Sequence, residues 1–170
     1  TRNYGADITL EQYMTRGFYG QVNGSLFKSE YRGLDKKWRS QLYDRGYMVK
    51  VLGGKEWMLG KRKQNVFNVS VKYTLQGGLR HTPIDVAAMK ANVAAGIIND
   101  QPIYKEDEAM SLQFDPTSIL DLTVSYKINC NKVSHTIAFE GVNILQNKTP
   151  YAERYDFSTG QLRYDKSGIS

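Results

Sequence analysis

The chain has 170 residues, of which 23 are basic and 17 acidic, and its formal net charge is +6. This length suits one ordinary domain or part of one. The basic residues are scattered and do not gather with aromatic residues into one patch, so we expect no nucleic-acid partner. Cys130 is the only cysteine, which excludes an internal disulfide and a Cys-x-x-Cys metal or redox site. The sequence contains no run of about 18 apolar residues that could form a spanning helix.

Alternation of apolar and polar residues predicts two strands in the first part of the chain. In residues 4–11, Tyr4, Ala6, Ile8 and Leu10 alternate with Asp7, Thr9 and Glu11. A turn is expected at residues 15–17. The second strand runs from Phe18 to about Tyr31 and places Val22, Gly24 and Leu26 opposite Gln21, Asn23 and Ser25. A long connection follows over residues 32–45.

The middle of the chain predicts two further strands and a helix. The third strand, residues 47–60, places Tyr47, Val49, Val51 and Gly53 opposite Lys50 and Glu56. After a short polar link at 61–64, the fourth strand covers residues 66–75, with Phe67, Val69, Val71, Tyr73 and Leu75 on one face. The connection at 79–114 is the longest, and within it Asp85 is expected to cap a helix that reaches Ile98.

The last part predicts two more strands. The fifth, residues 118–129, sets Leu120, Leu122, Val124, Tyr126 and Ile128 against polar residues on the other face. A short link at 131–134 leads to a sixth strand with Ile137, Phe139 and Gly141 on one face and Glu140 on the other. The chain from residue 147 onward is expected to be a third long connection.

Strand length and the alternation of short and long connections indicate the fold class. We expect an all-β fold of antiparallel up-and-down strands with short turns and long loops, forming part of a transmembrane β-barrel. Membrane-spanning strands need about 9 to 11 residues, and the two clearest segments reach that length. Because closed membrane barrels have at least about 8 strands, about six strands predict an incomplete barrel with two exposed edges. The charged residues of the polar face would then line the lumen: Lys50, Glu56, Lys72, Asp121, Lys127 and Glu140.

Two alternatives remain at this point. A soluble antiparallel sandwich or barrel that serves as a binding module would bury the same apolar face in its core. A passive porin or an outer-membrane enzyme would share the membrane fold. However, the sequence has no nucleophile elbow, phosphate loop or HExxH motif, so we expect no catalytic activity and no cofactor. The acidic run Glu106–Glu108, His81 and His135 lack the spacing of metal ligands, so we expect no metal site.

Several motifs, taken in order, resemble one family. They are Tyr31-Arg32-Gly33-Leu34-Asp35, then Lys37-Trp38-Arg39, Gly54-Lys55-Glu56-Trp57, Gly77-Gly78-Leu79-Arg80-His81-Thr82-Pro83-Ile84-Asp85, Leu120-Asp121-Leu122-Thr123-Val124-Ser125-Tyr126-Lys127 and a strand ending at Asn143-Ile144-Leu145-Gln146-Asn147. In this order and spacing, the chain resembles the late-barrel segment of TonB-dependent receptors of the Bacteroidetes type. It departs from the family pattern at Pro116–Leu122 and in lacking a closing strand with a terminal aromatic before Ser170.

This resemblance implies a location, a function and partners. It implies a partial C-terminal barrel region over residues 1–170, in the outer membrane, in contact with its lipid and lipopolysaccharide. The function implied is active import of a scarce small molecule, glycan or peptide, bound at extracellular loops. The energy would come from TonB through a plug domain, but neither a plug nor a TonB box can be read from residues 1–170.

Candidate ligand-binding residues lie in the long connections. Arg32, Trp38, Arg39, Tyr43 and Arg45 combine guanidinium groups and aromatic rings, which can grip anions and stack on rings. The same groups could equally meet lipopolysaccharide phosphates or hold the loop in place. Arg80 and His81, at the start of the longest connection, are further candidates.

Overall fold

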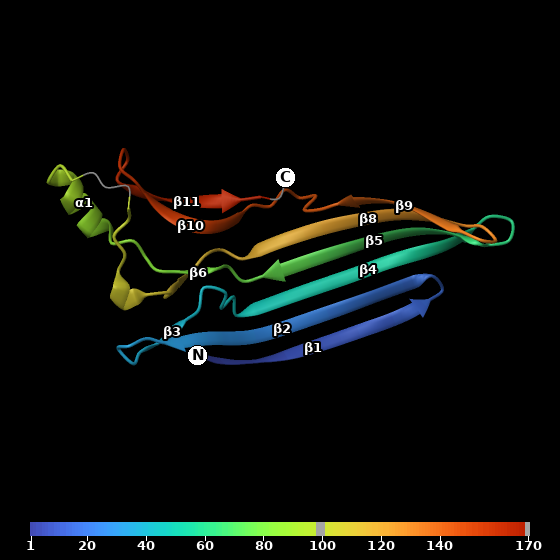
Figure 1. The fold of residues 1–170 in the computed structure, drawn as a ribbon, viewed down its shortest axis with the longest axis horizontal. Helices are drawn as coiled ribbons and strands as arrows, with labels where there is room; N and C mark the ends of the chain where they lie inside the picture. The colour runs from blue at the N-terminus through green and yellow to red at the C-terminus, as the bar shows by residue number, and fades with distance from the viewer. Residues whose placement is uncertain (98–100, 169–170) are drawn as a thin grey trace.

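A computed structural model of the chain describes residues 1–97 and 101–168 (Figure 1). The fold is all-β and antiparallel, with one short α-helix, as predicted. Its elements are β1 (Arg2–Thr15), β2 (Phe18–Arg32), β3 (Trp38–Ser40), β4 (Tyr47–Leu59), β5 (Asn65–Gln76), β6 (Arg80–His81), α1 (Val86–Ala94), η1 (Glu106–Glu108), β7 (Leu112–Gln113), β8 (Thr117–Asn129), β9 (Ser134–Gly141), β10 (Thr149–Asp156) and β11 (Gln161–Ser167). No described helix is long and apolar enough to cross a membrane.

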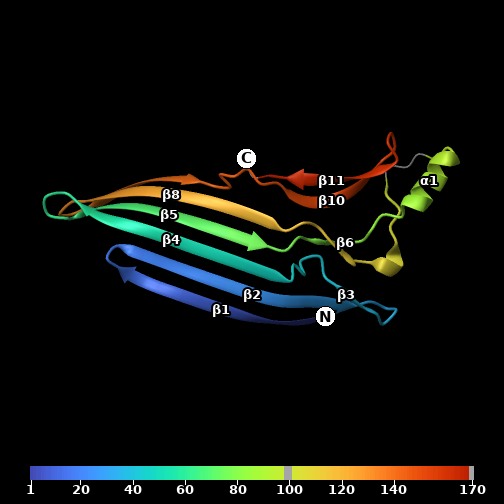
Figure 2. The ribbon, with the colours of Figure 1, turned by 180° about the vertical axis from the view of Figure 1, so that it is seen from behind.

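All six predicted strands are present, and they form one antiparallel sheet. The strand order is β1-β2-β4-β5-β8-β9, and the short β3 pairs with the end of β2. Within the described part of the chain the sheet is open, because β1 and β9 each have a neighbour on one side only. Figures 1 and 2 show the sheet as a single long, twisted layer.

The connections divide between the two ends of this sheet. The three short turns, which join β1 to β2, β4 to β5 and β8 to β9, lie together at one end (Figure 1). Helix α1, the β6–β7 pair and the β10–β11 hairpin lie at the other end. The first short turn places Arg16 and Gly17 at φ 54° and 83°, the left-handed conformation that tight hairpin turns require. A side chain on Gly17 would collide with the Glu56 carbonyl oxygen.

Two expectations about the end of the chain were wrong. The sixth strand ends at Gly141, not at residues 143–147, because the backbone reverses at Asn143 (φ 52°) and Gln146 (φ 53°). The Asn143 side chain closes this loop: it donates to the Asn147 carbonyl (3.0 Å) and accepts from the Asn147 N–H (3.1 Å). In addition, the connection expected from residue 147 onward contains a hairpin, β10–β11.

The longest connection contains the predicted helix. Asp85 caps α1 by accepting a hydrogen bond from the Ala88 N–H at 3.0 Å. The helix ends at Ala94, earlier than expected, because Gly96 (φ 71°) reverses the backbone. The predicted end at Ile98 falls outside the described residues.

The hydrophobic core of the chain lies beside this helix and not on the large sheet. Ile84, Met89 and Tyr155 are buried together, and Val86, Phe157 and Leu162 pack against them. The large sheet has no second layer over it among the described elements (Figure 2). Accordingly, the chain exposes 11905 Å², whereas a compact monomer of 19.4 kDa would expose about 8,500 Å².

Candidate functional site

One face of the large sheet is apolar and open to its surroundings. Strand pairing aligns Leu10, Val22, Val51 and Tyr73 in one row across four strands. Because partners in a register lie on the same face, the apolar residues predicted for each strand share this face of the sheet. Many are uncovered: Leu26 is 67% exposed and Phe139 is 73% exposed. An apolar surface of this extent is rare on soluble monomers and marks a contact with lipid or protein.

The opposite face is polar and carries most of the sheet's charge. Lys50, Glu56, Lys72, Asp121, Lys127 and Glu140, the residues predicted to line a lumen, all lie on it, together with Asp7 and Glu11. Lys72 and Asp121 face each other across β5 and β8 and form an ion pair of 2.8 Å. The Asn68 amide donates to the Tyr19 hydroxyl (2.9 Å) and to Glu56 (3.3 Å). These contacts fit a wall that faces water or polar protein groups.

The apolar face has a central band without charge. Across the six strands, no charged residue occupies this face between the rows of Lys28 and Phe18. Ten residue steps along β2 separate these rows, which at about 3.3 Å per residue and a tilt of about 45° span about 23 Å. The lipid-facing band of a membrane barrel is about 25 Å tall.

Charged and aromatic residues border this band on both sides. On one side, Arg2 and Lys28 pair with the buried Glu30 carboxylate on the same face. On the other side, the Lys55 Nζ lies 4.2 Å from the ring centre of Phe18 and 5.1 Å from that of Trp57. A lysine with a long apolar stem can reach a membrane surface from such a position, and aromatic rings are common there.

Two of the predicted ligand residues belong to this border. The register pairs Arg32 with Trp38, which places both on the apolar face beyond Glu30. The guanidinium carbon of Arg2 lies 4.3 Å from the Trp38 ring centre, and that of Arg32 lies 5.8 Å away. Arg32 also donates from Nε to the Lys36 carbonyl at 2.7 Å. Both residues therefore lie on the opposite side of the sheet from the polar face.

Arg39 and Tyr43 lie in the same connection but in different surroundings. The Arg39 guanidinium grips the Asp35 carboxylate with two hydrogen bonds of 2.9 and 2.6 Å. This pair, together with the Lys37 N–H, lowers the pKa of Asp35 from 3.8 to about 2. Tyr43 is 68% exposed. Of these two residues, Tyr43 is the one open to a ligand.

Arg45 and Arg80 fasten the long connections to each other. Arg45 donates to the Gly77 carbonyl at 2.9 Å, and burial lowers the pKa of its guanidinium. Arg80 donates from Nε to the Asp44 carbonyl (3.1 Å), and its Nη2 lies 3.6 Å from the buried Asp44 carboxylate. The other oxygen of that carboxylate accepts from the Ser29 N–H at 2.9 Å. Both arginines stabilise this end of the sheet, and their guanidinium groups are already engaged in these contacts within the chain.

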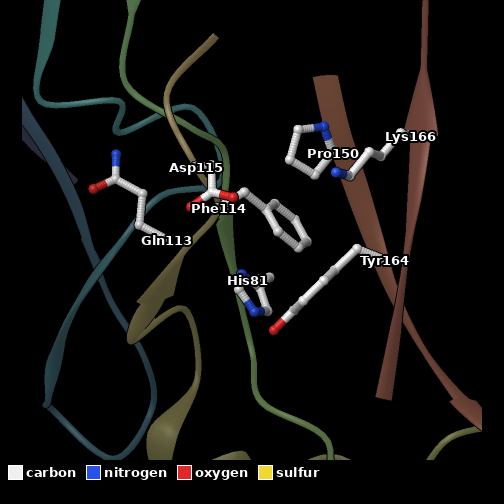
Figure 3. Close-up of a pocket in the computed structure, with 7 residues that line it drawn as sticks. All are labelled: His81, Gln113, Phe114, Asp115, Pro150, Tyr164 and Lys166. Carbon is white, nitrogen blue, oxygen red and sulfur yellow. The ribbon is translucent and has the colours of Figure 1, made fainter. Parts of the chain in front are cut away.

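His81 lies in a small cavity between the long connection and the β10–β11 hairpin (Figure 3). Its ring stacks on Phe114 with centres 4.0 Å apart, and the Tyr164 ring meets Phe114 edge-on. Both ring nitrogens of His81 are buried without a hydrogen-bond partner among the described residues. Burial lowers the pKa of His81, although the Glu153 carboxylate, 4.0 Å from Nε2, acts in the opposite direction.

This cavity has aromatic walls and two charged groups at its edge. It is lined by His81, Gln113, Phe114, Asp115, Pro150, Tyr164 and Lys166 and has a volume of about 110 Å³ (Figure 3). Pockets for drug-sized ligands are larger, about 300 to 1,000 Å³. The cavity can therefore hold a few water molecules or a single small group of a larger ligand.

The sequence analysis missed several residues that organise this end of the molecule. Glu153 is buried and accepts a hydrogen bond from the Ile84 N–H at 3.1 Å, which joins β10 to the segment before α1. Phe114 and Tyr164 form the aromatic walls of the cavity. No local pattern marks these residues, because each contact joins segments far apart in the chain. No group of three His, Cys, Asp or Glu residues within the described ranges is arranged to hold a metal ion.

Comparison of the chain with models of known protein families, with curated proteins and with solved structures gave no match.

Proposed function

We propose that this chain is a segment of an outer-membrane transporter, a TonB-dependent receptor, whose strands cross the membrane. The observation that carries the proposal is the charge-free band, ten residue steps long on β2, on one face of a single-layer sheet with a polar reverse face. Lipid hydrocarbon would cover the apolar face, and the polar face would line the barrel interior. The open edges at β1 and β9 would pair with further strands and so close the barrel.

We propose the transport step because the sequence motifs resemble those of TonB-dependent receptors. In this proposal, the long connections at the α1 end face the exterior and bind a scarce small molecule, glycan or peptide. Tyr43 and the cavity beside His81 belong to that end. A plug domain inside the barrel would link binding to TonB, which supplies the energy. No catalytic step, cofactor or nucleic acid has a part in this function.

A soluble sandwich is the main rival, and the large sheet provides an argument against it. A sandwich would bury Val51, Val71 and Phe139 under a second sheet. Among the described elements, however, the β10–β11 hairpin packs with α1 at the end of the sheet and does not cover these residues. In a soluble monomer the apolar face would then be exposed to water, which costs about 25 cal/mol for each Å² of apolar surface.

Lysine substitutions test which face meets lipid. Leu75 and Thr74 are neighbours on β5 that point to opposite faces, and both lie near the middle of the charge-free band. In the full chain refolded with phospholipid vesicles, we expect Leu75→Lys to lower the free energy of unfolding in the membrane by about 2 to 4 kcal/mol, because a lysine at mid-membrane depth is desolvated. Thr74→Lys, the matched control, should have little effect. Equal effects of both variants would contradict the proposal.

Transport itself needs a test in cells. In the organism that produces this chain, deletion of the gene should abolish uptake of the nutrient that the receptor binds. Loss of TonB should have the same effect, because import would lack its energy source. Uptake that persists without TonB would point to a passive porin instead.

A further inference from the structure

The three short turns form a cationic end of the sheet. Arg16 lies in the turn between β1 and β2, Lys61, Arg62 and Lys63 lie between β4 and β5, and Lys132 lies between β8 and β9. These turns contain no acidic residue. Figures 1 and 2 show all three at one end of the sheet, with the turn between β1 and β2 set back from the other two. We call these five residues the turn cations.

The turn cations have no counter-charge within the described residues. All five side chains are exposed, and none forms an ion pair there. By contrast, the rest of the chain is nearly balanced, with 18 basic residues (23 minus 5) and 17 acidic ones. The net charge of +6 is therefore unevenly distributed.

The four cations of the second and third turns lie close enough to act together. These two turns are two strands apart, about 10 Å, and end at the same level of the sheet, where Asn129 donates to the Gln64 carbonyl and to the Asn65 side chain. This spacing is similar to the Debye length of about 8 to 10 Å at moderate salt, so the fields of these two turns overlap. The first turn lies further back, at the level of Glu56, whose N–H donates to the Gly17 carbonyl, so Arg16 adds a more distant positive charge.

Exposed apolar side chains lie directly below the turn cations. Leu59 precedes the basic turn and is 42% exposed, and Val133 beside Lys132 is 55% exposed. A row of Trp57, Phe67 and Tyr126 follows on the apolar face. Cations above a ring of aromatic and aliphatic groups match the layering of a lipid surface, with phosphate outside and hydrocarbon inside.

We propose that the turn cations bind the headgroups of anionic phospholipids in the leaflet at the short-turn end. This inference rests on the proposed function, since it requires that the apolar face meet hydrocarbon. It adds a lipid class: the headgroups that meet the short-turn end are those of phosphatidylglycerol-like lipids. A nucleic acid fits less well, because the turns themselves contain no aromatic residue on which bases could stack.

Vesicle binding tests the inference. The full chain is diluted from denaturant into vesicles of phosphatidylcholine, with or without phosphatidylglycerol, and the bound fraction is measured by flotation. We expect phosphatidylglycerol to raise partitioning about tenfold or more at low salt, and high salt to remove most of this gain. No dependence on phosphatidylglycerol would overturn the inference.

Two variants with the same net charge provide the control. In the first, Arg16, Lys61, Arg62, Lys63 and Lys132 are replaced by glutamine, and in the second, Lys36, Lys37, Lys90, Lys105 and Lys148 are replaced by glutamine. The first should lose the phosphatidylglycerol effect and the second should keep it. Equal losses would show that net charge alone is responsible and would overturn the inference. If the first variant fails to form strands by circular dichroism, K61Q/R62Q/K63Q takes its place and should lose most of the effect.

The same experiment separates this inference from the proposed function. If the unmodified chain inserts equally well in both kinds of vesicle, the membrane role stands and the headgroup preference is wrong. If the chain inserts in neither, the proposed function fails, and the inference fails with it.

Discussion

The Lys72 ammonium lies 2.8 Å from the Asp121 carboxylate, directly across the pairing of β5 and β8 on the polar face. Asp121 is buried and also accepts a hydrogen bond from the Asn143 N–H at 2.9 Å. It therefore joins the wall of the sheet to the loop that follows β9. Lys72 is more exposed and serves one of these contacts only.

The two partners of this pair should differ in their effect on stability. Replacing Asp121 by alanine leaves the Asn143 N–H without its acceptor, so we expect a loss of about 1 to 3 kcal/mol in the free energy of unfolding. Lys72→Ala should lower it by less than about 1 kcal/mol, because the lysine is half exposed. Urea unfolding of the refolded chain measures both, with Thr123→Ala on the same strand and face as control. Equal losses would contradict the anchoring role of Asp121.

The Arg39–Asp35 pair predicts an acid titration. Arg39 is the main cause of the low Asp35 pKa of about 2, so in Arg39→Gln this pKa should rise toward its ordinary 3.8. The contribution of the Arg39–Asp35 pair to the stability of the fold is complete above pH 3.8 and is lost as the pH falls toward 2. The Asp35 carboxyl shift in NMR spectra measures the change. Lys36→Gln is the control, and an Asp35 pKa near 3.8 in the unmodified chain would contradict the contact.

His81 predicts a loss of stability at acidic pH that arises from burial of the ring and not from an ion pair. Burial lowers its pKa below 6.5, so the folded cavity binds a proton less readily than the unfolded chain does. The stability of this region should be complete above 6.5 and should fall as the pH drops below that value. Hydrogen exchange of the Phe114 amide should therefore be faster at about pH 5 than at about pH 7.5, after correction for intrinsic rates.

A variant without the titrating group checks this assignment. His81→Phe keeps a flat ring against Phe114 and should remove the pH dependence of exchange. His135→Phe, a substitution in β9, should leave it unchanged. If His81→Phe retains the pH response, another group causes it.

The small core beside α1 should unfold independently of the large sheet. Met89 is buried with Ile84 and Tyr155, and its sulfur lies 3.3 Å from the Ile103 N–H. Met89→Ala should destabilise this cluster by about 2 to 5 kcal/mol. Hydrogen exchange should then accelerate in β10 and β11 and not in β5 or β8. The exposed neighbour Lys90→Ala is the control, and a uniform acceleration would indicate one cooperative unit.

The alternation of side chains made the sheet predictable. Each of the six strands has enough two-residue periodicity to fix both its existence and its faces, as in Phe67, Val69 and Val71. The same parity places Arg32 on the face of Leu26, so the position of Arg32 on the apolar side could have been found from the sequence, whereas that of Trp38 depends on the pairing of β3 with β2. The helix was predictable from Asp85 and the alanines after it.

The β10–β11 hairpin and the cavity could not be predicted in this way. Pro150 lies in β10 and cannot donate a hydrogen bond, which argues against a strand. Glu153 is buried because it receives the Ile84 N–H from a segment 69 residues away, and burial of this kind leaves no local signal. The stacking of His81 on Phe114 likewise depends on the pairing of two very short strands, β6 and β7.

The central claim is that one face of the sheet touches lipid and the other touches water. Its most direct test is a scan of single spin labels along β5, from Asn68 to Tyr73, in a Cys130→Ser background with the chain in phospholipid vesicles. We predict that collision with oxygen is highest at Val69, Val71 and Tyr73, and collision with a water-soluble nickel chelate is highest at Asn68, Ser70 and Lys72. Loss of this alternation, or its reversal, would contradict the proposed membrane role.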